Sequence, residues 1–186
     1  DAFLDCKYMT GTVQIPDGLT TLERAWNGMK LTGPVVVPQG IKVINGIGAP
    51  ITSLIIPEGV EEVNGIFGQG WDKRGDPKTL KGDIILPSTL KRLGDGAFSG
   101  TGISHISIPE GIDVIPASAF SETDIIDTLK LPSTITLINH HAFYSCEFSF
   151  DILDNKLFKC KLIDIFLKNA ISKQTLVLIC HIRDMQ

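Results

Sequence analysis

The chain of 186 residues has only four cysteines, and they stand far apart at Cys6, Cys146, Cys160 and Cys180. None has the Cys-x-x-Cys spacing of a zinc site. No apolar run is long enough to span a bilayer. The formal net charge is only −4, which lacks the basic footprint of a nucleic-acid-binding protein. These absences argue against a zinc protein, a membrane-spanning chain and a nucleic-acid partner.

Motifs for catalysis or for binding cofactors and metals are also missing. The stretch 65–70 is glycine-rich, but it has neither the GxGxxG order nor a following Gly-Lys-Ser/Thr, so a turn leading into a loop is favoured. Asp72, Asp76 and Asp83 match no EF-hand spacing, and we interpret them as loop residues. The adjacent histidines 140–141 cannot both face one way in an extended segment. We therefore expect no enzyme, no cofactor and no metal site.

What the chain does have is a short phrase that recurs six times: apolar, any residue, apolar, proline. Successive prolines are 22, 19, 30, 22 and 23 residues apart. A repeat near this length predicts a solenoid, in which small units stack because none can bury its apolar face alone. The six phrases end at Pro16, Pro38, Pro57, Pro87, Pro109 and Pro132.

The residues around each proline keep the same phase. Those before it alternate as in a short strand, which proline ends because it has no N–H to donate. Apolar residues follow three and six places after each proline, and three repeats then carry Ala97-Phe98, Ala119-Phe120 and Ala142-Phe143. Each repeat therefore predicts a strand, a turn and an apolar filler for the interior.

The turn after proline has two versions. Four repeats use Asp, Gln or Glu followed by glycine, whereas two use Ser88-Thr89 and Ser133-Thr134. We expect glycine to supply a positive φ, and serine or threonine to bond to the local backbone.

Residues 86–98 read Leu-Pro-Ser-Thr-Leu-Lys-Arg-Leu-Gly-Asp-Gly-Ala-Phe, which resembles the BspA-type leucine-rich repeat. The segments 2–6 and 142–146 resemble the family's Ala-Phe-x-x-Cys ending, and the resemblance covers about residues 1–148. The unit after Pro38 departs from the pattern because it has Ile47-Gly48 in place of the Ala-Phe pair and so lacks the aromatic residue. The resemblance implies a right-handed leucine-rich-repeat solenoid, mostly β with short turns, with parallel strands, one per repeat of about 22 residues.

The same resemblance implies a non-enzymatic protein-interaction or adhesion module of a secreted or cell-surface protein. Its partner would be a protein, for example on a host surface or in the extracellular matrix. A structural spacer within a larger surface protein, and a carbohydrate-binding or enzyme-associated domain, remain open as alternatives. The chain starts without Met and inside a repeat, so we interpret it as a fragment or a processed chain, and the lack of a signal peptide decides nothing about its compartment.

Two features that depart from the regular repeat contain the candidate protein-binding residues. One is the column of residues expected to point outward before each proline, where Val36, Ile55 and Ile85 are apolar beside Gln14, Ser107 and Lys130. A column that only stabilises the sheet is the alternative. The other is the insertion 68–78, whose Trp71, Lys73 and Arg74 are residue types enriched at interfaces.

The last part of the chain abandons the pattern, and we divide the chain into a repeat domain, 1–148, and a C-terminal cap or extension, 149–186. A helix over about 154–170 and a strand-like run over 175–180 would cap the open end of the stack. The alternative is that this segment is not native to the repeat domain. Cys6 and Cys146 are predicted to be small buried residues, and nothing requires Cys160 and Cys180 to pair.

Overall fold

The computed structural model describes residues 15–24, 26, 33–66, 77–125, 129–146 and 150–151, and all structural statements concern these residues. The predicted helix over 154–170, the run 175–180, Cys6, Cys160 and Cys180 lie outside them. So does nearly all of the insertion 68–78, including Trp71, Lys73 and Arg74.

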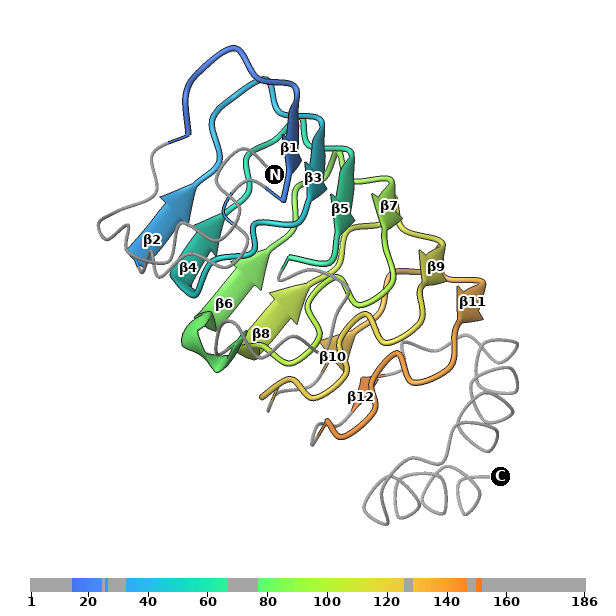
Figure 1. Cartoon of the computed structure of the whole chain (residues 1–186). Coiled ribbons are helices and arrows are strands. Elements are labelled where there is room, and N and C mark those ends of the chain that lie inside the picture. The colour runs from blue at the N-terminus through green and yellow to red at the C-terminus, as the bar shows by residue number, and fades with distance from the viewer. Residues whose placement is uncertain are drawn as a thin grey trace, which may run out of the picture.

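The described chain is a solenoid of parallel strands arranged in two rows (Figure 1). One row holds β2 (Gly33–Val36), β4 (Ile51–Ile55), β6 (Lys81–Ile85), β8 (Gly102–Ser107) and β10 (Leu129–Lys130), which precede prolines, and β12 (Phe150–Asp151), which pairs with β10. The other row holds β1 (Thr21–Glu23), β3 (Val43–Asn45), β5 (Glu62–Asn64), β7 (Arg92–Leu93), β9 (Val114–Ile115) and β11 (Leu137–Ile138). A short 3-10 helix, η1 (Pro77–Thr79), leads into β6.

Strand pairing aligns equivalent residues of successive repeats. In the second row Leu22 pairs with Ile44, Ile44 with Val63, and Val63 with Leu93, all in parallel register. These are the apolar residues six places after each proline. The leucine-rich-repeat solenoid predicted from the sequence is therefore confirmed.

The predicted number of strands, one per repeat, was too low. The chain forms a second strand after each described turn. In β3 and β5 the central residues, Ile44 and Val63, are fully buried, while their neighbours on either side are half-buried. This alternation is that of a strand with one face on the core. Three residues were too few for the pattern to be recognised as a strand from the sequence.

The core lies between the two rows. Strand residues that point inward fill most of it, and the Ala-Phe pairs close its far side as predicted. The rings of Phe98 and Phe120 stack at a centroid distance of 5.8 Å, and those of Phe120 and Phe143 at 5.4 Å. In the repeat that lacks an aromatic residue, Ile47 is fully buried and its N–H donates to the carbonyl of Ile66 at 2.6 Å, so the backbone pairing between these coils continues.

The turn glycines serve two different purposes. Gly18, Gly40 and Gly59 have φ of +87°, +99° and +99°, as the sequence predicted. Gly111 is not in this region. A Cβ at Gly111 would instead lie 2.6 Å from the carbonyl oxygen of Leu90 in the preceding coil. Glycine at this turn is therefore required by the close approach of two backbones.

This distinction gives a stability prediction. Gly111→Ala should lower the free energy of unfolding by roughly 2–3 kcal/mol, because the neighbouring backbone must move. Gly82→Ala is the matched control, since Gly82 has φ +83° but open space within 4 Å. It should cost only about 1 kcal/mol of backbone strain. Urea unfolding monitored by circular dichroism measures both, and equal losses would contradict the contact argument.

Candidate protein-interaction surface

The candidate surface is the outer face of the row that begins with β2, β4 and β6. Val36, Ile55 and Ile85 point outward there, with exposed fractions of 60%, 59% and 76%. Val36 and Ile55 are register partners, and β4 contacts β6, which carries Ile85. We call these three side chains the apolar ridge.

The alternation of each strand fixes the ridge in place. Val35, Leu54 and Ile84 precede the ridge residues and are buried in the core. The residues that follow the ridge residues, Val37, Ile56 and Leu86, are buried as well. Since successive strand residues point to opposite faces, the residue between two core anchors must point to solvent. The ridge is thus held on rigid backbone rather than on a loop.

The ridge ends at a polar group on β6 and β8. Ile85 pairs with Ser107, and two residues earlier Asp83 pairs with His105 on the same face. A carboxylate oxygen of Asp83 lies 2.8 Å from Nδ1 of His105, and both side chains are substantially exposed. An apolar centre with a polar border is the composition typical of a protein interface.

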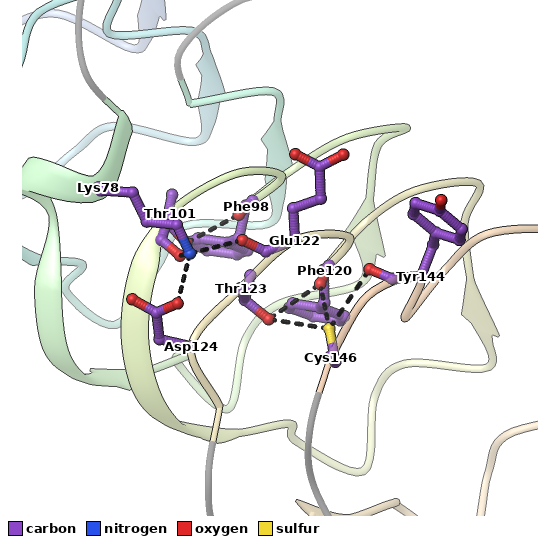
Figure 2. Close-up of polar contacts among 9 residues, drawn as sticks. All are labelled: Lys78, Phe98, Thr101, Phe120, Glu122, Thr123, Asp124, Tyr144 and Cys146. Carbon is purple, nitrogen blue, oxygen red and sulfur yellow. Dashed lines mark hydrogen bonds and ion pairs between the residues drawn. The ribbon is translucent and has the colours of Figure 1, made fainter. Parts of the chain in front are cut away.

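The other predicted contact residues belong to the insertion 68–78. Trp71, Lys73 and Arg74 lie outside the described residues. The end of the insertion is nevertheless anchored, through Lys78 of η1. Figure 2 shows its ammonium group between two coils.

Lys78 bridges elements that are far apart in the sequence. Its Nζ donates to the carbonyl of Glu122 at 2.8 Å and to that of Thr101 at 3.4 Å, and it pairs with the carboxylate of Asp124 (Figure 2). The chain that leaves the insertion is therefore fixed to the two following coils before it enters β6.

The two versions of the turn prove to be complementary, which sequence reasoning missed. The Glu58 carboxylate accepts hydrogen bonds from the backbone N–H and hydroxyl of Ser88, both at 3.0 Å, and from the N–H of Thr89. Glu110 accepts the same pair of bonds from Ser133 at 3.0 and 2.8 Å. The signal was present in the last four repeats, where Glu-Gly and Ser-Thr turns alternate.

These bonds lower the pKa of Glu58, chiefly through the backbone N–H of Ser88 and then its hydroxyl. A carboxylate with a lowered pKa in the folded state adds stability above its unfolded pKa of about 4.3, and that stability disappears as pH falls through the folded value. The Glu58–Ser88 contact is therefore an acid-sensitive link between coils.

Glu58→Gln should lower the urea midpoint at pH 7, because the amide cannot accept all three bonds as a charged carboxylate does. The difference from the parent chain should shrink on acidification below pH about 4 and vanish where both side chains are uncharged. Glu23→Gln, on the exposed part of β1, is the control and should have little effect at either pH. A Glu58→Gln effect that is independent of pH would contradict the assignment.

The second row carries charged pairs instead of an apolar ridge. Glu61 lies between Lys91 at 2.7 Å and Lys42 at 3.4 Å, and the hydrogen bond and charge of Lys91 are the main causes that lower its pKa. Glu62 pairs with Arg92 at 2.5 Å, and its pKa is lowered chiefly by the Asn64 amide. Because these charges face partners within the chain, the apolar ridge remains the more promising contact surface.

Comparison with known families agrees with this architecture. Residues 78–158 match the family model described as "BspA type Leucine rich repeat region (6 copies)". This stretch is a BspA-type leucine-rich repeat region. Searches of curated proteins and of solved structures found no match. Residues 62–63 of β5 precede the matched stretch and pair in parallel register with residues 92–93 inside it.

Solenoids of the BspA-type repeat are typically binding scaffolds rather than enzymes. In the part of the chain that the structure describes, no group of three or more His, Cys, Asp or Glu residues is arranged to hold a metal ion. The rings of His140 and His141 meet edge to face at 5.4 Å, and His141 meets Tyr144 at 5.5 Å. No helix among the described residues has the length and apolarity to cross a membrane.

The repeat's cysteine position is structural in the BspA-type region. Cys146 is buried and unpaired, as predicted, and its thiol donates to the carbonyl of Phe120 at 2.9 Å (Figure 2). Thr101 and Thr123 occupy the same position in the two preceding repeats, and each donates its hydroxyl to the carbonyl of the phenylalanine three residues earlier. Burial is the main cause that raises the pKa of the Cys146 thiol.

A variant that keeps Cys146 and replaces the other three cysteines by serine should therefore react slowly with a thiol reagent. The raised pKa leaves little thiolate at neutral pH, and the side chain is shielded from solvent. The rate measured with Ellman's reagent should rise at least tenfold in denaturing urea. Equally fast labelling of the folded protein would contradict the buried placement.

Proposed function

We propose that this repeat region is a protein-interaction module whose contact surface is centred on the apolar ridge. The observation that carries the proposal is the exposure of Val36, Ile55 and Ile85 on rigid, neighbouring strands. Burying what remains exposed of each side chain would be worth about 1–2 kcal/mol. Little of that gain is lost to ordering, because the backbone is already held by the solenoid.

A wider role is proposed from the family resemblance. In it the repeat domain 1–148 serves adhesion on a secreted or cell-surface protein, and its ligand is a host-surface or extracellular-matrix protein. We further propose that Trp71, Lys73 and Arg74 extend the contact, because the end of their insertion is anchored by Lys78 beside β8. A structural spacer would need no apolar column, and the ridge therefore favours binding over spacing.

The test is a triple variant, Val36→Thr, Ile55→Thr and Ile85→Thr. Threonine keeps the β-branched shape that suits a strand but removes much of the apolar surface. Capture of extracellular-matrix proteins by the immobilised chain should fall at least tenfold.

Leu19→Thr with Leu137→Thr is the matched control. These leucines are 40% and 44% exposed and lie away from the ridge, so their replacement should leave capture unchanged. Circular dichroism and the urea midpoint verify that both variants are folded. Undiminished capture by a folded triple variant would refute the proposed surface.

A further inference from the structure

We infer that η1 is a staple that joins two strand pairs of the solenoid, β2–β4 and β6–β8, at a point where no β-ladder joins them. The inference goes beyond the proposed binding function, because it concerns how the solenoid is held closed and does not depend on what binds the apolar ridge. It follows from the strand pairing, from the direction of the backbone groups in β4, and from the contacts of η1.

The strand ladder of this row is interrupted between β4 and β6. β2 pairs with β4, and β6 pairs with β8, both in parallel register. β4 and β6 are neighbours and are described over their whole length, yet they share no paired register. In the other row the same two coils do pair, since Val63 of β5 is the partner of Leu93 in β7. A strand ladder therefore joins these coils in the second row but not in the first.

The backbone of β4 shows which groups face the interruption. The carbonyl of Ile55 accepts the N–H of Val37 at 3.0 Å, so the backbone groups of Ile55 face β2. Because successive residues of a paired strand present these groups to opposite sides, those of Leu54 face β6. Leu54 is buried, and its amide is shielded from water only while β6 stays beside it. Its exposure to solvent therefore reports opening between β4 and β6.

The side chains of η1 make contacts on both sides of the interruption. The hydroxyl of Thr79 donates to the carbonyl of Ile51, the first residue of β4, at 3.0 Å. The ammonium group of Lys78 donates instead to the carbonyls of Thr101 and Glu122, which lie in the coils of β6 and β8 (Figure 2). Two adjacent residues thus connect the β2–β4 pair to the β6–β8 pair.

The backbone of η1 lies close against the β6–β8 pair. A Cβ at Gly102, the first residue of β8, would lie 2.8 Å from the carbonyl oxygen of Lys78 and 3.2 Å from that of Leu80. Leu80, which follows η1, is fully buried. η1 is therefore held by the β6–β8 pair, and the Thr79 hydroxyl is a group through which it contacts β4.

The test is amide hydrogen exchange of the isotope-labelled chain, compared between Leu54 and Ile55. These neighbours face the interruption and the β2 ladder respectively, whereas global unfolding exposes both alike. In the parent chain the protection factor of Leu54 should be at least tenfold lower than that of Ile55. Thr79→Val removes the hydroxyl and keeps the β-branched shape. It should lower the protection of Leu54 at least a further fivefold and leave Ile55 unchanged.

A second variant tests the other end of the staple. Lys78→Met should also lower the protection of Leu54, because η1 loses part of its hold on the β6–β8 pair. Since the Lys78 side chain is partly exposed, about 0.5 M sodium chloride should have the same effect on the parent chain but not on this variant. Lys91→Met is the matched control. Lys91 pairs with Glu61 at 2.7 Å across the same two coils, but in the second row, so its loss should leave Leu54 unchanged.

Equal protection of Leu54 and Ile55 in the parent chain would overturn the inference. A parallel loss of protection at both residues in Thr79→Val or Lys78→Met would overturn it too, because that marks general destabilisation rather than release of a staple. Thr79→Ser keeps the hydroxyl and should exchange like the parent chain. Failure of this rescue, or an effect of Lys91→Met on Leu54, would also count against the staple.

Discussion

The parallel pairing of equivalent residues in successive coils is the constraint on which the rest of the structure depends. Leu22, Ile44, Val63 and Leu93 follow one another in register, so a property repeated in the sequence becomes a column in space. Core columns are buried together, and outward columns form continuous strips of surface. A departure from the repeat therefore changes a strip, which is why three aliphatic residues in one outward column make a surface feature.

This constraint also explains which parts could be predicted from the sequence. Position relative to the repeated proline is enough to predict the solenoid and its inward residues. It also predicts that Val36, Ile55 and Ile85 point outward. The second row of strands was missed because each contains only two or three residues. The contacts of Glu58 and Glu110 were missed because they join turns from different coils, and local turn chemistry contains no information about its neighbour.

The turns that follow the prolines form specific contacts between neighbouring coils. A Glu-Gly turn presents a carboxylate, and the following Ser-Thr turn presents the N–H and hydroxyl groups that satisfy it. Where a Glu-Gly turn instead follows a Ser-Thr turn, the glycine, Gly111, lets its coil approach the Leu90 carbonyl closely. Alternating the two turns thus gives each interface between these coils a favourable contact, and two adjacent Glu-Gly turns would instead face each other with like charges.

The same row of strands shows that strand pairing does not require an aliphatic residue at every position of the ridge column. β8 is the longest of the described strands at 6 residues, and it carries Ser107 in the ridge column. Pairing with β6 therefore proceeds without an aliphatic residue at that position. β-branched residues do favour strands, but threonine would provide this preference without exposing apolar surface to water. We therefore propose that the aliphatic side chains of Val36, Ile55 and Ile85 serve contact with a partner rather than the stability of the sheet.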